Sequence, residues 1–222
     1  MRLSFKSKNQ MVHEALLDAI VRGEFPPDER IIIDELAQRM QVSPIPIREA
    51  LRELEADGFV SFAPHVGFTV TPIHAELMIE VFALLESMEV FSSRRACETI
   101  TDSDLAALET MIRKMDQSVS DPARWSQDNK ALHSLICDIA QAALIKQMLQ
   151  KALNHWERLM RFYFQDVFSR RVQIAQQEHW QLLDAFKKRD ADSAEHIIRT
   201  HNQTALADYL KQVSEIQREE HS

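Results

Sequence analysis

Three histidines and one asparagine occupy positions from which the folded chain could assemble a metal site. In the segment DNKALHSLI, Asn129 and His133 stand at i and i+4, so a helix would present both side chains on one face. His179 and His201 are equidistant from residue 190, which lies inside the turn sequence RDADS. Residues equidistant from the turn of an antiparallel helical hairpin lie at the same height, so the two imidazoles should meet. The spacing predicts a site made of these four side chains.

Three imidazoles and one oxygen ligand suit a divalent transition metal such as zinc, nickel, manganese or iron, with room for water or a further ligand. Asp128 is rotated from Asn129 by about 100° around the helix, and either residue could supply the oxygen. A metal with only neutral protein ligands would keep a positive charge and attract a small anion, most simply a carboxylate. A second interpretation stays open, in which the histidines are unrelated core residues.

The elements that would position these side chains are helices. From residue 73 to residue 222 no segment has the alternation of a strand, and helix-starting residues divide the sequence into about six helices. These residues are Thr101, Ser103–Asp104, Asp121–Pro122, Ser169 and Asp190. Long helices with short connections predict an antiparallel all-helical bundle.

Residues 1–72 predict a different domain. A helical stripe at 8–22 ends at Gly23, FPPDER is a turn, and 33–40 form a short helix. A longer helix, REALRELEAD, follows two prolines that are tolerated only in a first turn. Two β-branched and aromatic runs around APHVG predict a hairpin. The order predicts a winged helix-turn-helix, so the fold class is mainly α, with a helical bundle after residue 72.

In a helix-turn-helix the second helix enters the major groove by its N-terminal residues. Ser43, Pro44 and Ile45 would then face base edges and the nearest phosphates, helped by the helix dipole. Arg48 and Arg52 would face the DNA on the same side of the helix. In the wing, His65 either touches a phosphate or is an ordinary solvated loop residue.

The charge balance weakens the prediction of a nucleic-acid partner without excluding it. The net charge is −8, but phosphate contacts need only local positive charge, since screening limits its reach to about 8 Å. No secretory signal precedes the first helix, and no apolar run approaches the roughly 20 residues of a membrane span. Cys97 and Cys137 lack CxxC spacing. We therefore expect a cytoplasmic protein with reduced, buried thiols and no membrane partner.

The runs LAQRMQVSPIPIREALRELEADGFV and PHVGFTV resemble the GntR superfamily of bacterial transcription regulators, over residues 12–71. The resemblance implies that Ser43 and Arg48 contact DNA and that Gly67 is the wing glycine that lets the backbone approach the groove. The sequence departs from the family where Pro44 and Ile45 replace an arginine and a threonine. Neither replacement can donate a side-chain hydrogen bond to a base, which changes the expected operator sequence.

The phrases QEHWQLL and LLDAFKKRDADSAEHIIRTHN resemble the FCD effector domain of the FadR subfamily, whose pattern is [DN]xxxH followed by two later histidines. This resemblance supports a metal held by Asn129, His133, His179 and His201, beside a small-molecule effector. Many relatives carry an arginine that pairs with a carboxylate effector, where this chain has Leu85. The alternative effector anchors are Arg158, Arg161 and Tyr163, which are equally compatible with ordinary surface residues.

These features predict a homodimeric transcription regulator that binds double-stranded palindromic operator DNA, with an affinity modulated by a small metabolite. Such a protein would be nucleoid-associated when bound. The main alternative is a metal-dependent helical-bundle enzyme, although no histidine has Glu three residues before it and HExxH is absent. A helical adaptor without DNA would leave the winged element unexplained.

Overall fold

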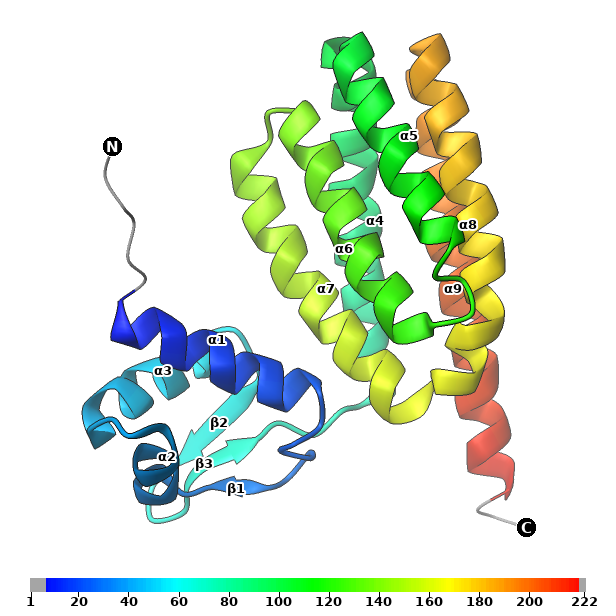
Figure 1. Cartoon of the computed structure of the whole chain (residues 1–222). Coiled ribbons are helices and arrows are strands. Elements are labelled where there is room, and N and C mark those ends of the chain that lie inside the picture. Colours follow the sequence, from blue (N-terminus) through cyan, green and yellow to red (C-terminus); the bar gives the residue numbers. More distant parts are fainter. Residues whose placement is uncertain (1–6, 220–222) are drawn as a thin grey trace. The chain divides into compact units, whose positions relative to one another are not determined.

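The computed structural model describes residues 7–219, apart from the side chains of Ala75, Tyr163, Gln165 and residues 213–219. Two compact units divide between His74 and Ala75, two residues after the predicted boundary. The first unit combines helices with a small sheet, and the second is helical (Figure 1). No helix within the described part of the chain is long and apolar enough to cross a membrane.

The first unit confirms the predicted winged helix-turn-helix. Its elements, in chain order, are α1 (Lys8–Val21), β1 (Arg30–Ile31), α2 (Ile33–Met40), α3 (Pro44–Ala56), β2 (Val60–Ala63) and β3 (Gly67–Val70). The sheet has the order β1-β3-β2, and both pairings are antiparallel. The sequence does not predict β1, because two residues are too few for an alternating pattern and Arg30 falls in the expected turn FPPDER.

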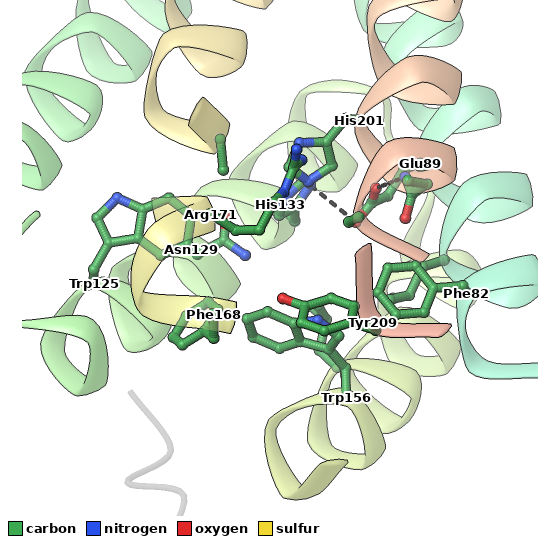
Figure 2. A pocket seen from close by; sticks show the side chains of 15 residues that line it. Phe82, Glu89, Trp125, Asn129, His133, Trp156, Phe168, Arg171, His201 and Tyr209 are labelled. Carbon is green, nitrogen blue, oxygen red and sulfur yellow. Dashed lines mark hydrogen bonds and ion pairs between the residues drawn. The ribbon is translucent and has the colours of Figure 1, made fainter. Parts of the chain in front are cut away.

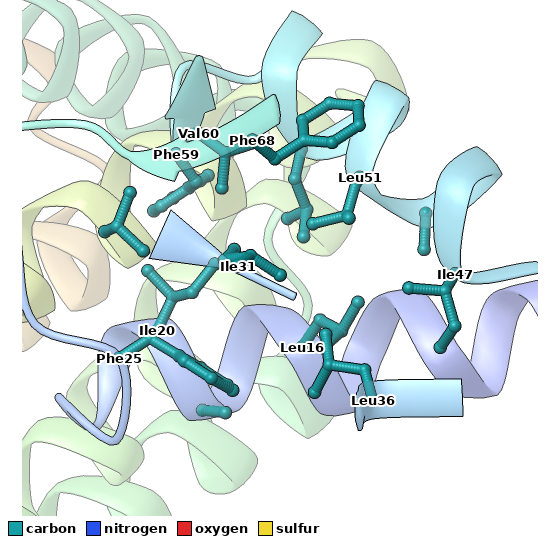
Figure 3. Close-up of a cluster of buried hydrophobic side chains, with 14 of the residues drawn as sticks. Leu16, Ile20, Phe25, Ile31, Leu36, Ile47, Leu51, Phe59, Val60 and Phe68 are labelled. Carbon is teal, nitrogen blue, oxygen red and sulfur yellow. The ribbon is translucent and has the colours of Figure 1, made fainter. Parts of the chain in front are cut away.

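A single apolar core holds these elements together (Figure 3). Ile20 of α1 and Ile47, Leu51 and Leu54 of α3 are completely buried. Phe59, which follows α3, is 1% exposed, so these residues mark the inner side of the helix. Because both long helices of the unit and the strands share this core, the orientation of α3 is fixed by apolar packing.

The second unit is a helical bundle, as predicted. Its helices are α4 (Ala75–Thr99), α5 (Asp102–Asp116), α6 (Pro122–Ile139), α7 (Ala143–Tyr163), α8 (Gln165–Lys188) and α9 (Ala191–Glu219). The helix α4 contacts α6, α7 and α9 and is therefore central. In Figure 1, α4 lies between α7 and the hairpin of α8 and α9, and α6 lies in front of it.

Three of the predicted helix starts carry the expected side-chain caps. Thr101 and Asp121 accept hydrogen bonds from the backbone N–H of residues 104 and 124, and Asp190 accepts one from residue 193. The predicted start at Ser169 is wrong, because Ser169 lies inside α8. The break falls instead at Phe164, whose backbone leaves the helical region without a polar cap. A break of that kind leaves no signal in the sequence.

Both cysteines are free and buried, with Cys97 in α4 and Cys137 in α6. Burial raises the pKa of the Cys97 thiol from 9.0 to about 11 and also raises the pKa of Cys137. We expect thiol reagents to leave the native protein unmodified at pH 8 and to label both cysteines after unfolding. The unfolded thiol loses its proton first, so the stability that Cys97 contributes should decline as pH rises from about 9 towards 11. Rapid modification of native protein at pH 8 would contradict this expectation.

Candidate metal centre and DNA-recognition surface

The fold brings the three predicted histidines together from three helices. His133 lies on α6, His179 on α8 and His201 on α9, and each offers a nitrogen within 4.8 Å of the others. Three nitrogens bound to one tetrahedral zinc ion lie about 3.4 Å from one another, since each bond is about 2.1 Å. Side-chain rotations that move each nitrogen by about 1 Å or less towards the centre of the cluster would therefore close it around an ion.

The turn between α8 and α9 sets the height of two of these rings. Arg189 adopts a left-handed conformation at φ 54° and ends α8, and Asp190 caps α9. The Arg189 guanidinium also donates to the backbone oxygen of Ile100 at 2.7 Å, which ties the turn to the end of α4. His179 and His201 then face each other across the hairpin with ring centroids 5.7 Å apart. The predicted register of the hairpin agrees with this contact.

Two glutamates orient His133 and His201. Nδ1 of His133 lies 3.2 Å from Glu89 on α4, and Nδ1 of His201 lies 2.6 Å from Glu178 on α8. A metal-bound histidine usually donates its other ring N–H to a carboxylate, which fixes the tautomer and the ring orientation. With Nδ1 facing a carboxylate in this way, Nε2 is the nitrogen that each ring would offer to a metal, and Figure 2 draws the contact between His133 and Glu89 as a dashed line.

The third histidine and the asparagine have unused polar atoms. Neither ring nitrogen of the buried His179 has a hydrogen-bond partner among residues 7–219, and the same holds for Oδ1 of Asn129. The His179 ring stacks on Trp125 with centroids 5.6 Å apart. Buried polar atoms without partners are costly and require a reason. A metal ion that takes one nitrogen of His179 and the Asn129 oxygen would supply one.

The adjacent Asp128 has a different partner. Its Oδ1 accepts a hydrogen bond from Nζ of Lys114 on α5 at 2.6 Å. Asn129 lines the cavity beside the histidines, whereas Asp128 does not. The geometry therefore favours Asn129 over Asp128 as the oxygen ligand.

The protonation states also fit a metal. Burial lowers the pKa of His179 well below its ordinary value, and the neighbouring His133 and His201 lower it further. Burial also lowers the pKa of His133, although the Glu89 carboxylate opposes this effect. Both rings are therefore neutral at pH 7, which is the form that binds metals.

The two glutamates change the charge expected for the site. Glu89 is 4% exposed, and within the described residues its partners are His133 and the Asn202 amide, which donates at 2.8 Å. A buried carboxylate without a cationic partner is unfavourable. Together Glu89 and Glu178 offset the charge of a divalent ion, so the ion would not leave the net positive charge predicted from its neutral ligands alone.

A cavity of about 30 Å³ adjoins the cluster. That is room for about two water molecules, or for one small group such as a carboxylate. The cavity is bordered by Leu85 and by Arg171 of α8, a cation that was not among the predicted site residues.

The predicted effector anchors lie elsewhere. Arg158 is buried and does not line this cavity, and Arg161 is exposed beside a separate surface pocket formed by α6, α7 and Phe168. The structure therefore does not support either arginine as an anchor next to the histidines. The Tyr163 side chain falls outside the described residues.

At the other predicted site, α3 begins as the sequence indicated. Ser43 is the N-cap, its side chain makes no capping hydrogen bond, and Ser43, Pro44 and Ile45 are all exposed. Because Pro44 and Pro46 lack an N–H, Ile45 provides the only backbone donor in the first three helical positions. This turn is therefore a poorer phosphate site than the dipole argument suggested, which leaves more of the binding to side chains.

The two predicted arginines of α3 differ in their surroundings. Arg48 is exposed, and its side chain has no ion pair or hydrogen bond among residues 7–219. Arg52 pairs with Glu55 at 2.6 Å, and its guanidinium lies over the Phe62 and Phe68 rings of the wing. Arg52 fixes the wing against α3, so we expect it to affect DNA binding indirectly.

The wing tip carries the other two predicted residues. His65 is exposed between β2 and β3 with φ 66°, and Gly67 follows at φ 95°. A Cβ on Gly67 would meet only the Arg30 side chain, at 4.0 Å. The positive φ, rather than crowding, therefore explains glycine at this position.

Comparison with known proteins shows the family. Residues 8–70 match "Bacterial regulatory proteins, gntR family", and residues 80–204, more than half of the chain, match the "FCD domain". The chain belongs to the GntR family and carries an FCD domain.

Curated relatives of this GntR chain include the "Uncharacterized HTH-type transcriptional regulator YdhC" of Bacillus subtilis, 25% identical over 91% of each chain. The "Nta operon transcriptional regulator" of Aminobacter aminovorans is 29% identical over 78% of this chain and 82% of its own. The chain is thus a transcriptional regulator, and the interpretation as an enzyme finds no support among these relatives.

Solved structures agree with the fold. "E. coli McbR/YncC" matches with a TM-score of 0.81 at 22% identity, over 94% of this chain and 100% of the other. A putative GntR regulator from Rhodococcus sp. RHA1 matches with a TM-score of 0.75 at 20% identity, over 93% and 99%. The winged unit and the helical unit therefore occur together in known regulators.

Proposed function

We propose that this regulator, a member of the FadR subfamily, binds a palindromic operator as a homodimer and responds to a small carboxylate metabolite. The metabolite would bind beside a divalent metal (zinc, nickel, manganese or iron) in the helical unit. The observation that carries this proposal is the cluster of His133, His179 and His201, with unused polar atoms next to a small cavity. The protein would act in the cytoplasm and on the nucleoid.

The DNA contacts would come from exposed residues of α3 and the wing. Ser43, Pro44 and Ile45 at the start of α3 would approach the base edges, and Arg48 would supply the main charged contact. In the wing, His65 and Gly67 would lie against the phosphate backbone. Arg52 would support the wing through its contacts with Phe62 and Phe68.

Glu89 would connect the proposed metal site to α4, the helix that follows the winged unit in the chain. Glu89 lies on α4 and contacts His133, and α4 begins at Ala75, directly after the residues 71–74 that follow the wing. A ligand that moves His133 changes the environment of a buried charge on α4. Such a change alters operator affinity only if the DNA-competent and incompetent arrangements present different sites to the ligand.

The test is direct binding of metal-loaded, full-length protein to fluorescent DNA fragments from its own genomic neighbourhood, followed by anisotropy. We expect one fragment to bind with two chains per palindrome and to compete at least about 1,000-fold better than a shuffled fragment. Equal binding to native and shuffled fragments would contradict sequence-specific regulation, and one chain per palindrome would contradict the dimer.

A further inference from the structure

Arg171 is a buried cation that borders the cavity next to the histidines (Figure 2). It is 6% exposed and lies on α8, about two turns before His179. Burying an arginine is costly unless its donors are used. Its position therefore calls for a partner inside the bundle.

The partners that the fold provides satisfy Arg171 only in part. Nη2 lies 3.4 Å from Glu178 and Nη1 lies 3.6 Å from Asp208, both longer than the roughly 2.8 Å of a strong charged hydrogen bond. The buried Nε has no hydrogen-bond partner among residues 7–219. One donor of the guanidinium is thus unused, at the edge of a cavity that admits a small group.

The charges around the cavity also indicate that Arg171 would attract an anion. A divalent metal would be offset by Glu89 and Glu178, which both contact its histidine ligands. Arg171 is the only lysine or arginine among the residues that line the cavity in the described part of the chain. Its charge therefore provides the positive excess that an anion requires, while the half-exposed Asp208 is screened by water.

Arg171 also faces a second hollow, on the surface between α8 and α9. This groove is lined by Arg170, Arg171 and Lys211 together with Asp208. Since Arg171 borders both hollows, a change in the conformation of its side chain would connect the inner cavity with the surface. A negatively charged ligand would reach the cavity along cationic side chains.

From these observations we infer that Arg171 anchors a small monocarboxylate in this cavity. Leu85, which stands where many related sequences have a carboxylate-binding arginine, cannot pair with the anion. The inference rests on the proposed function and specifies its ligand. One carboxylate oxygen would accept from the guanidinium and the other would face the histidines. The rest of the lining is mainly apolar and aromatic, including Phe82, Trp156 and Tyr209, and it contains the Glu89 carboxylate. Because the cavity has room for about one small group, the tail of the ligand must be short and apolar, and a second carboxylate on the ligand would be repelled.

Acetate and propionate are suitable probes, with acetamide and succinate as comparisons. Trp125 and Trp156 line the cavity, so tryptophan fluorescence can follow titrations of full-length protein with and without stoichiometric zinc. We expect acetate and propionate to bind zinc-loaded wild type, and acetamide and succinate to bind at least about tenfold more weakly. Arg171→Met should weaken acetate binding at least about tenfold, which corresponds to the loss of one charged hydrogen bond. The zinc content of this variant should equal that of wild type.

The matched control is Arg95→Met, which removes an exposed arginine of the same unit that lines neither hollow and should leave acetate affinity within about twofold of wild type. If Arg171→Met unfolds, as judged by circular dichroism, Arg171→Lys keeps the charge without the planar fork and should still lose several-fold in affinity. Zinc binding with unchanged acetate affinity in the folded variant would overturn the role of Arg171 and leave the metal site intact. Absence of zinc binding, with acetate binding that still depends on Arg171, would overturn the metal site instead. Wild type that binds no monocarboxylate, or binds succinate more tightly than acetate, would overturn the inference.

Discussion

Replacement of Arg48 by alanine is expected to lower operator affinity by about 10- to 100-fold for each half-site. The exposed side chain lies one turn into α3 and has no partner among the described residues, so binding to DNA breaks no existing ion pair. A charged hydrogen bond to a base edge or a phosphate contributes about 1.5–3 kcal/mol, which corresponds to that reduction in affinity. Since Pro44 and Pro46 remove two backbone donors from the same turn, little else there can replace Arg48.

Anisotropy titrations over a series of salt concentrations provide the measurement. If Arg48 binds a phosphate, the slope of log affinity against log salt should become shallower by about 1 for each arginine–phosphate pair that the substitution removes. Arg22→Ala is the matched control, because Arg22 is an exposed arginine of the same unit that already pairs with Asp18 at 2.9 Å. Arg48→Ala protein that binds like wild type at every salt concentration would show that α3 does not read the DNA.

The second large effect is expected on metal content and melting temperature when one histidine ligand is removed. His201→Ala is expected to reduce bound metal from one ion per chain to nearly none. A ligand present at 100 times its dissociation constant stabilises the folded state by about 2.7 kcal/mol, so the variant should melt about 5–10 °C lower than metal-loaded wild type. Elemental analysis of protein purified without an affinity tag and calorimetry together measure both effects.

His196→Ala is the matched control, since His196 lies on the same helix and is exposed. The His196→Ala protein should bind as much metal as wild type and melt at the same temperature. Equal metal content in the His196→Ala and His201→Ala proteins would contradict the site. So would wild type that binds no metal and does not gain stability when zinc or manganese is added.

Apart from β1 and the helix break at Phe164, the sequence predicted the fold and the cluster of histidines, for physical reasons that concern particular residues. Helix periodicity placed Asn129 on the same face as His133, and symmetry about residue 190 placed His179 level with His201. Both relations are local or follow from one tight turn. They can therefore be predicted without knowledge of how the other helices pack.

The surroundings of the cluster depend on packing between distant helices, and the sequence alone did not indicate them. Glu89 reaches His133 across α4 and α6, and nothing in its local sequence marks it. Arg158 of α7 is buried outside the set of residues that line the cavity, and its local sequence does not reveal this. Arg171 did leave a signal, because it interrupts the apolar face formed by Phe168, Val172 and Ala175, where a charged residue is unusual.

The most direct test of the whole account is the operator affinity of metal-loaded protein with and without short monocarboxylates, from formate to butyrate. We predict that at least one of them changes the affinity of wild type by about 5- to 150-fold, the usual range of allosteric coupling. The triple variant with His133, His179 and His201 replaced by alanine should bind the operator at its basal affinity and show no response. A folded triple variant that still responds like wild type, or wild type that responds to none of these anions, would contradict the account.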